Sequence, residues 1–287
     1  AVGEAIDQQN PRLIHAASNF MNGVAAGSAA ISRGIPFIYE VRGLWEVTKA
    51  SRQPCWAGSQ EFTYMSNMER DAAIHATTVL TLTEGLRDEM VKRGVDRDKI
   101  VLVPNGVDSS RFVPRDPDEA LRAELGIGDR LVIGYIGSIV PYEGLDDLID
   151  AVAVLRETHR DRFRVLIIGD GKSLEELREQ SANLGLDDYI LFTGRVPHED
   201  VERYYSLIDI CPFPRKPQLV CELVSPLKPF ESMAMCKAIV ASNVQALGEI
   251  VQDGVTGLLF EKGSTASLVE ALDRLLKDGD LRTDLGL

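Results

Sequence analysis

The sequence is poor in the residues that build metal sites, disulfide frameworks and membrane spans. Its 287 residues include four histidines and four cysteines, and the cysteines are scattered without a CxxC pair or a Cys/His cluster. This pattern argues against a zinc site and for reduced thiols in a cytosol. No apolar run approaches the roughly 20 residues that a membrane-spanning helix needs. The first residues, AVGEAIDQQNPRL, also lack the basic start and apolar core of a signal peptide.

Two motifs of cofactor and metal enzymes are missing as well. A strict GxGxxG is absent, which counts against a nicotinamide or flavin fingerprint. No DxD pair stands at the end of a predicted strand, and the adjacent pairs Asp146-Asp147 and Asp187-Asp188 are typical of solvated helix or loop faces. We therefore expect neither a metal ion nor a bound cofactor.

Acidic charge is concentrated in the second part of the chain. Residues 1–115 carry 13 basic and 13 acidic residues, whereas residues 116–287 carry 18 basic and 31 acidic ones. A surface with this negative excess repels nucleic acid and anionic lipid. It still permits a small anionic ligand where basic side chains gather at one place.

Alternating strand and helix patterns predict an α/β protein with parallel sheets. The length of 287 residues and a hydrophobic content of 45% fit about two globular domains. In residues 1–115, short apolar or β-rich runs alternate with predicted helices at 22–33, 61–76 and 84–93; the runs lie at 13–15, 36–41, 78–82 and 100–103. Thr83 is well placed to cap the last of these helices.

A second alternating unit begins near Asp116. Its predicted strands include 131–136, 163–168, 189–192, 208–212, 238–241 and 258–260, and its last helix 266–277. We place the domain boundary at 115/116. The first unit has few strands for a complete doubly wound sheet and lacks the usual glycine-rich first turn, so we expect the chain to be a part of a longer protein.

Glycine follows three consecutive predicted strands of the second unit. These positions are Gly137-Ser138, Gly169-Asp170-Gly171 and Gly194-Arg195. In a parallel sheet the carboxyl ends of the strands share one edge, where ligands bind. Glycine lets the backbone approach a phosphate, and the helix that follows presents free N–H groups. Each glycine alone is compatible with an ordinary turn, but three together favour a nucleotide site.

Residues 215–234 gather cations in an otherwise acidic domain. The segment contains Arg215, Lys216 and Lys228, and we expect a helix with Ser225 as N-cap and Pro226 at its first position. Free N–H groups and Lys228 then form an anion site. Glu231, one turn further, is suited to accept hydrogen bonds from ribose hydroxyls. The alternative is a solvated capping segment with a glutamate on the helix surface.

Six motifs resemble, in order and spacing, those of the family-four (group 1) glycosyltransferases. They read NGVDSSRF, GYIGSIVPYEGLDDLIDA, VLIIGDG, FTGRVPHEDVERYYSLIDICPFP, SPLKPFESMAM and EIVQDGVTGLLF. The resemblance implies a retaining enzyme of the GT-B fold, in which two Rossmann-like domains face each other across a cleft. It also implies that residues 116–287 bind a nucleotide sugar and that residues 1–115 form the partial acceptor-side domain.

The resemblance also assigns individual residues. Glu231 matches the second glutamate of the E-x7-E motif, which holds the donor ribose. The other matches are Gly137 and Ser138 (first phosphate loop), Arg195 and Val196 (beside the base), and Pro226, Leu227 and Lys228 (amides facing the diphosphate and sugar). With Gly169 and Gly171 from the strand ends, these residues form the predicted donor site. Lys228 and Arg42 are the predicted catalytic residues.

The chain departs from the family's donor-site pattern at three places. The first motif glutamate should stand at Leu223, which puts the contact to the donor sugar in doubt. Ser138 and Glu143 occupy positions where the family usually has Arg and Lys, a pair that neutralises the diphosphate. Lys228, Arg215 and Lys216 are the candidates to replace them, and weaker donor binding is the alternative.

Two residues of the first unit are candidates for its ligand side. Arg42 stands where many relatives carry a cleft histidine, and a guanidinium cannot act as a base. The alternative for Arg42 is a salt bridge to Glu40 or Glu46. His15, at the end of a short predicted strand, is a candidate to line the acceptor site, and a structural role is its alternative.

The function expected from this resemblance is sugar transfer from a nucleotide-diphosphate sugar to a sugar, lipid-linked or small-molecule acceptor. Bacterial polysaccharide or glycoconjugate synthesis is the usual setting, in the cytoplasm or at the inner face of the membrane. Two alternatives remain open: a non-catalytic nucleotide-sugar-binding or assembly subunit, and a sugar-nucleotide epimerase on the same fold. The sequence does not reveal the oligomeric state.

Overall fold

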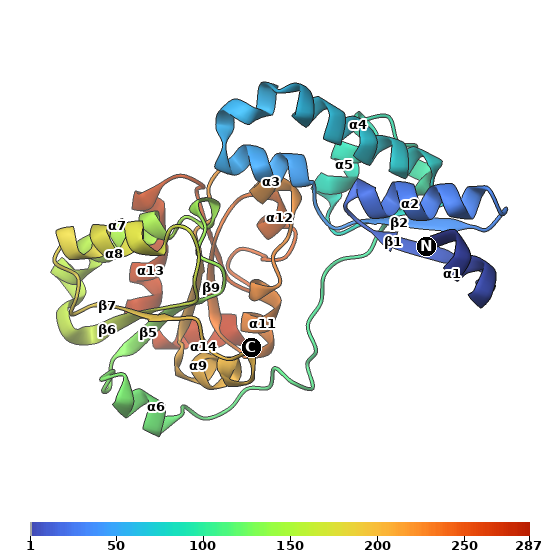
Figure 1. Cartoon of the computed structure of the whole chain (residues 1–287). Helices are drawn as coiled ribbons and strands as arrows, with labels where there is room; N and C mark the ends of the chain where they lie inside the picture. Colours follow the sequence, from blue (N-terminus) through green and yellow to red (C-terminus); the bar gives the residue numbers. More distant parts are fainter. Residues whose placement is uncertain (1) are drawn as a thin grey trace. The chain divides into compact units, whose positions relative to one another are not determined.

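Two parallel β-sheets organise the structure, a computed structural model that describes residues 2–287 (Figure 1). Each sheet belongs to its own compact unit. The first unit comprises the chain up to Asn105 together with Gln218–Ser225, and the second comprises Gly106–Pro217 and Pro226–Leu287. The predicted class, α/β with two parallel sheets, is confirmed. The boundary at 115/116 stays a prediction.

The first unit holds a four-stranded sheet in the order β1-β2-β3-β4, with every neighbouring pair parallel. Its elements are α1 (Val2–Gln9), β1 (Ile14–Ala17), α2 (Phe20–Ile31), β2 (Phe37–Val41), α3 (Trp45–Arg52), η1 (Pro54–Gly58), α4 (Gln60–His75), β3 (Thr78–Thr81), α5 (Glu84–Lys92), η2 (Arg97–Lys99) and β4 (Ile100–Leu102). The Thr83 side chain accepts a hydrogen bond from the Leu86 N–H, so its predicted capping role is confirmed.

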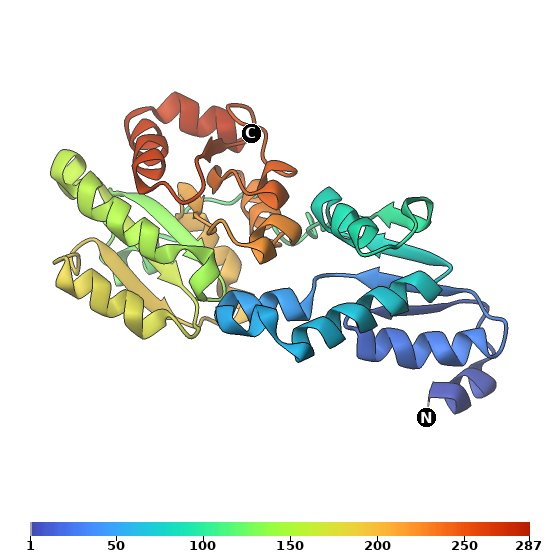
Figure 2. The ribbon, with the colours of Figure 1, turned by 90° about the horizontal axis from the view of Figure 1, so that it is seen from above.

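Helices α2 and α4 lie side by side on one face of this sheet (Figure 2). Gly23 and Gly27 let α2 pack closely on β2, because a Cβ atom at Gly23 would lie 2.6 Å from the Tyr39 ring and one at Gly27 2.9 Å from the Phe37 ring. Alternation along β2 leaves Ile38 and Glu40 half-buried on the opposite face. That face carries the first unit's candidate residues.

The second unit holds a six-stranded parallel sheet in the order β10-β9-β8-β5-β6-β7. Its elements are α6 (Glu119–Glu124), β5 (Leu131–Ile136), η3 (Pro141–Glu143), α7 (Leu145–His159), η4 (Arg160–Arg162), β6 (Phe163–Ile168), α8 (Leu174–Asn183), β7 (Ile190–Gly194), η5 (His198–Asp200), α9 (Val201–Leu207), β8 (Ile210–Phe213), α11 (Lys228–Ala234), β9 (Ala238–Ser242), α12 (Gln245–Gly248), β10 (Leu258–Phe260), α13 (Thr265–Lys277) and α14 (Gly279–Gly286). Strand order reverses between β5 and β8, so this point is the topological switch at which parallel sheets bind ligands.

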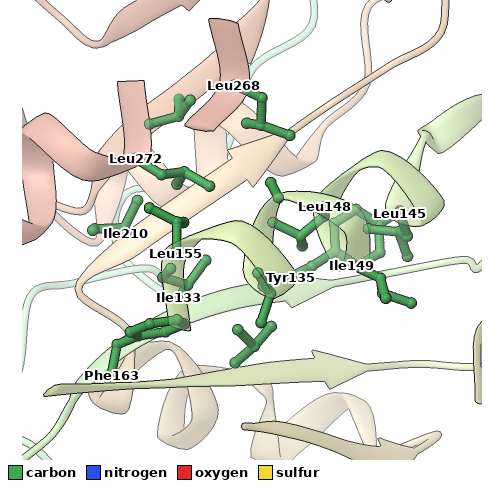
Figure 3. Packing of buried hydrophobic residues seen from close by; sticks show 14 of the residues in the cluster. Ile133, Tyr135, Leu145, Leu148, Ile149, Leu155, Phe163, Ile210, Leu268 and Leu272 are labelled. Atoms are coloured by element: carbon green, nitrogen blue, oxygen red, sulfur yellow. The ribbon is translucent and has the colours of Figure 1, made fainter. Parts of the chain in front are cut away.

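An apolar layer between the sheet and two helices holds the second unit together. Figure 3 shows Leu148 and Leu155 of α7 and Leu272 of α13 directed toward the β-strands. These leucines are at most 1% exposed. Burying an aliphatic side chain of this size stabilises a fold by about 1.5–3 kcal/mol relative to leaving it exposed. The layer gives the strand ends, where the candidate site lies, a rigid support.

Residues 218–225 interrupt the second unit in sequence but pack with the first. This segment includes α10 (Leu219–Leu223), which contacts α3 and α5. The Thr83 hydroxyl donates to the Leu223 carbonyl at 2.5 Å, and the Asn105 amide donates to Ser225 at 3.0 Å. Asn105 therefore ties this segment to the end of the first unit's sheet region.

The helix start predicted at Ser225 and Pro226 is wrong. Helix α11 begins at Lys228 with Leu227 as its N-cap residue, and its first turn contains Pro229. Ser225 instead pairs with Asn105, so its side chain belongs to the first unit. The positions of Lys228 and Glu231 on one short helix agree with the prediction. No helix among residues 2–287 is both long and apolar enough to cross a membrane.

A buried acid fastens α4 to the start of α2. The Glu69 carboxylate accepts hydrogen bonds from the Tyr39 hydroxyl at 2.5 Å and from the Phe20 N–H at 2.8 Å, and Glu69 is 1% exposed. Burial raises the pKa of Glu69 to about 7, although the hydrogen bond from Tyr39 opposes the shift. Folding therefore favours the protonated form of this group.

We predict that this acid makes the free energy of unfolding depend on pH. The contribution of Glu69 is fully present below about pH 4.5 and is lost as the pH rises through about 7. Each unit of pKa difference corresponds to about 1.4 kcal/mol. In Glu69→Gln the pH dependence that Glu69 contributes to the free energy of unfolding should disappear. Urea unfolding at a series of pH values measures it. Glu61→Gln, an exposed change on the same helix, should keep the wild-type slope, and an identical slope in both variants would contradict the prediction.

Candidate functional site

A cavity of about 640 Å³ lies at the carboxyl ends of β5, β6 and β7. Six predicted donor-site residues line it: Gly137, Ser138, Gly169, Gly171, Arg195 and Val196. Asp170 and His198 line it too, and the sequence analysis did not select them for the site. A cavity of about 740 Å³ lies elsewhere, near the amino ends of β5 and β6. We assign the site to the first because ligands of parallel sheets bind at carboxyl ends.

The cavity floor consists of backbone turns that pass very close to one another. The Gly137 N–H donates to the Ile168 carbonyl at 2.9 Å, and the Ile139 N–H donates to the Asp170 carbonyl at 2.9 Å. A Cβ at Gly169 would lie 1.9 Å from the Gly137 oxygen, and one at Gly171 2.0 Å from the Ile139 oxygen. Both glycines also have positive φ angles. Only glycine allows two turns to meet in this way.

Lys228 lies against the first of these turns. A Cβ at Gly137 would fall 2.8 Å from Lys228 Cδ, and Lys228 Nζ donates to the Tyr135 hydroxyl at 2.6 Å. Lys228 Nζ also forms an ion pair with Glu143 at 2.9 Å. The prediction that Lys228 stands beside the Gly137 loop therefore agrees with the geometry, although Lys228 itself does not line the cavity.

The other two predicted cations have protein partners. Lys216 Nζ contacts Asp146 at 2.8 Å and Asp147 at 2.7 Å. Arg215 is 4% exposed and faces Glu143 at 3.5 Å. Lys228 is paired as well, with Glu143, but it is the basic residue of this segment that lies against Gly137, which lines the cavity.

Glu231 is held by a buried tyrosine. The Tyr205 hydroxyl donates to Glu231 Oε2 at 3.0 Å, and Tyr205 is 1% exposed. Burial raises the pKa of Glu231, whereas the hydrogen bond from Tyr205 and the nearby charges of His198 and Lys228 act in the opposite direction. Pro226 and Leu227 precede the helix, and Leu227 is 51% exposed. Tyr205 lies within one of the six motifs, but the sequence analysis did not select it for the site.

A polar cluster of three side chains forms at the carboxyl edge of the first unit's sheet. His15 Nε2 lies 3.0 Å from Glu40, and Arg42 donates to both carboxylate oxygens of Glu40 at 2.9 and 3.1 Å. The hydrogen bonds from Arg42 hold the pKa of Glu40 below its usual value, and burial opposes them. The ion pair to Glu40 expected as one alternative for Arg42 is present, whereas Glu46 pairs with Arg93.

Among residues 2–287, no group of three histidine, cysteine or acidic side chains is arranged to hold a metal ion. All four cysteines are free thiols, of which Cys211 and Cys221 are buried. The site thus consists of glycine turns, one buried ion-pair cluster and a half-buried carboxylate.

Two family models cover most of the chain. Residues 117–286 match the model "Glycosyl transferases group 1", and residues 1–106 match "Glycosyl transferase 4-like domain". The chain belongs to the group 1 glycosyl transferases. The resemblance seen in the six motifs is confirmed by these matches, and the glycine turns of this family member lie within the first matched range.

Individual relatives agree with the family. The chain is 31% identical over 218 residues to the alpha-D-kanosaminyltransferase of Streptomyces kanamyceticus, covering 75% of this chain and 55% of that protein. It is 33% identical over 216 residues to the D-inositol 3-phosphate glycosyltransferase of Nocardia farcinica, covering 73% and 47%. The chain thus spans about half the length of these curated relatives.

Solved structures of related folds superpose on nearly the whole chain. Anabaena HepE in complex with UDP superposes with a TM-score of 0.83 at 19% identity, covering 99% of this chain and 74% of that one. Sucrose-phosphate synthase from Thermosynechococcus elongatus gives a TM-score of 0.79 at 21% identity, with 99% and 69% covered. The expected GT-B fold class is therefore confirmed.

We predict that the close contact of the two turns makes Gly169 irreplaceable. Gly169→Ala should lower the free energy of unfolding by the cost of a positive φ, about 1 kcal/mol, and by about 1–3 kcal/mol more for the clash with Gly137. Gly254→Ala is the control, since its φ is +71° but no atom lies within 4 Å of the added Cβ. Equal losses in urea unfolding would show that the backbone contact is unimportant.

Proposed function

We propose that the protein containing this chain is a retaining glycosyltransferase that uses a nucleotide-diphosphate sugar as donor. The observation that carries the proposal is the meeting of the Gly137 and Gly169 turns with the Lys228 ammonium at the β5/β8 switch point. Backbone turns without side chains let phosphate oxygens approach, and a cation stabilises charge on a departing diphosphate. No metal ion or cofactor enters this proposal.

The names of similar proteins support the donor class. HepE is described in complex with UDP and with UDP-glucose, and a relative from Mycolicibacterium smegmatis is named as GDP-mannose-dependent. We propose that Arg195 and Val196 lie beside the base, and that Pro226, Leu227 and the Gly137-Ser138 and Gly169-Gly171 turns surround the phosphates and sugar. Glu231 would hold the ribose.

The first unit is proposed to receive the acceptor. His15 Nε2 and Arg42 both contact Glu40, so the positive charge of Arg42 is balanced, and Nδ1 of His15 takes no part in this contact. Such a cluster can hydrogen-bond to the hydroxyl groups of a sugar, lipid-linked or small-molecule acceptor. We propose synthesis of a bacterial polysaccharide or glycoconjugate as the setting, in the cytoplasm or at the inner face of the membrane.

One observation favours a second candidate, a non-catalytic nucleotide-sugar-binding subunit. Arg215, Lys216 and Lys228 all pair with carboxylates of the protein, so each cation that could replace the family's Arg and Lys is partly neutralised. The test is to incubate the protein with radiolabelled UDP- and GDP-sugars and candidate acceptors. Release of nucleoside diphosphate together with a labelled product supports transfer, and binding without release supports the second candidate. Interconversion of the sugar without release would instead indicate an epimerase.

We predict that Glu231→Ala weakens binding of the nucleoside diphosphate by roughly ten- to hundredfold. A hydrogen bond to a charged group contributes about 1.5–3 kcal/mol, and Glu231 should accept from the ribose hydroxyls. Calorimetry with UDP and GDP measures the change, and Glu222→Ala, a change in the first unit, is the control. Unchanged affinity in Glu231→Ala would remove this residue from the donor site.

We predict that Arg42→Ala changes nucleoside diphosphate affinity by less than about threefold but lowers transfer by roughly a hundredfold, a loss typical of one preorganised electrostatic donor. Arg42→Lys should rescue only in part, because lysine lacks the planar fork that binds both oxygens of Glu40. Arg42 is 61% exposed in its side chain, so its ion pair contributes little to stability. Normal turnover with a lower melting temperature would assign Arg42 a structural role instead.

A further inference from the structure

Glu143 is a buried carboxylate between two cations of the candidate site. It is 4% exposed, its Oε2 lies 2.9 Å from Lys228 Nζ, and its Oε1 lies 3.5 Å from Arg215 Nη2. Burial raises the pKa of Glu143, but the charges of Lys228 and Arg215 outweigh it and hold the pKa below its usual value. An ionised carboxylate at this depth needs such partners, since an unpaired buried charge is very costly.

The local chain is built to place Glu143 there. Gly144 has a φ of +72°, and a Cβ at Gly144 would lie 1.8 Å from the Pro214 carbonyl oxygen. The turn after β5 thus packs directly against the segment after β8. The Lys216 N–H donates to the Tyr142 carbonyl at 3.0 Å, and the Arg215 guanidinium lies 5.7 Å from the centre of the Tyr142 ring. These contacts hold Glu143 at the switch point between the two strands.

An ion pair and two hydrogen bonds connect this carboxylate with the Gly137 turn. Lys228 Nζ lies 2.9 Å from Glu143 Oε2 and donates to the Tyr135 hydroxyl at 2.6 Å, and the Tyr135 hydroxyl donates to the Ser138 carbonyl at 2.8 Å. The Lys228 side chain also lies against Gly137, where an added Cβ would fall 3.2 Å from Nζ. These contacts place the ammonium group beside the turn of the proposed donor site.

The positions of the acidic and basic residues here differ from the family pattern. The family pattern has a lysine where Glu143 stands, whereas here the cation comes from the start of α11. Lys228 is a long, flexible side chain, and lysine loses considerable rotamer entropy when it is fixed. A fixed partner is therefore needed to hold its ammonium group beside Gly137.

We propose that Glu143 is a positioning residue that fixes the Lys228 ammonium against the Gly137 turn and keeps it charged, so that Lys228 can bind the donor diphosphate. The inference rests on the proposed function, because it assigns a role in donor binding. Glu143 acts through Lys228 and does not contact the phosphates itself, since like charges repel.

The groups that face Lys228 determine what removing Glu143 should do. Burial lowers the pKa of Lys228, Glu143 and Glu231 raise it, and Arg215 lowers it. Tyr135 contributes a neutral hydroxyl. In Glu143→Gln, burial and Arg215 are opposed by Glu231 alone. Lys228 should then lose its proton at a lower pH than in the wild type.

The first experiment measures the pH at which Lys228 loses its proton, without any ligand. The titration of Lys228 is followed by NMR on protein labelled with ¹³C at lysine Cε, and its signal is assigned by its absence in Lys228→Ala. Glu143→Gln should lower the titration midpoint by about one pH unit or more. Asp146→Asn is the matched control, because it removes a carboxylate that pairs with Lys216. A midpoint that is the same in Glu143→Gln and the wild type would overturn the proposal.

The second experiment measures the preference for UDP and GDP over uridine and guanosine by calorimetry between pH 6 and pH 9. In Glu143→Gln this preference should fall about tenfold or more below the wild-type value at the alkaline end, with a smaller deficit at pH 6, where loss of the Lys228 proton is least. Glu143→Asp keeps the charge but shortens the reach, so it should lower the preference equally at every pH. It also provides a folded variant if Glu143→Gln is unstable.

Lys228→Ala separates failure of this inference from failure of the proposed function. If Lys228→Ala keeps the full preference for the diphosphate, the proposed donor site is wrong. If Lys228→Ala loses the preference but Glu143→Gln matches the wild type at every pH, only the positioning role is wrong. If neither UDP nor GDP binds, the donor class is contradicted, and the NMR titration still decides whether Glu143 controls Lys228.

Discussion

The direct contact between the turns after β5 and β6 is the constraint on which the candidate site depends. Gly137 and Gly169 meet backbone to backbone, and the hydrogen bond from Gly137 to Ile168 fixes their spacing. Side chains on either turn would separate them. Because Gly137 and Gly169 carry no side chains, a cation at the first turn comes from elsewhere in the chain, and Lys228 at the start of α11 lies against Gly137. The buried ion-pair cluster follows from that requirement.

Much of this fold could be predicted from the sequence, because the signals are local. Runs such as FRVLII and the cap at Thr83 are contained in a few residues, and the structure has them as β6 and the start of α5. Residues at three strand ends line one cavity for the same reason: Gly137 after β5, Gly169 and Gly171 after β6, and Arg195 after β7. Parallel strands bring their carboxyl ends to one edge whatever lies between them.

The parts that the sequence did not predict depend on contacts between distant residues. Ser225 followed by Pro226 is a good local helix start, yet Asn105, 120 residues away, takes the Ser225 side chain. Glu143 looked like the loss of a cation, and only its distances to Lys228 and Arg215 reveal a partner. Tyr205 lies within one of the six motifs, but its contact with Glu231 joins residues 26 apart in the sequence and belongs to no single motif. Local sequence patterns do not predict side-chain contacts between residues that are distant in the sequence.

Because residues 218–225 pack with the first unit, recombination between relatives is constrained. A single genetic crossover near 105/106 would join one parent's first sheet to the other parent's α10. Val220, Cys221 and Leu223 are at most 5% exposed, so each would have to fit a surface with which it had not evolved. Hybrids that exchange 218–225 together with the first unit would keep these contacts intact. Each unit therefore has its own core, but the first unit can be exchanged intact only if residues 218–225 are exchanged with it.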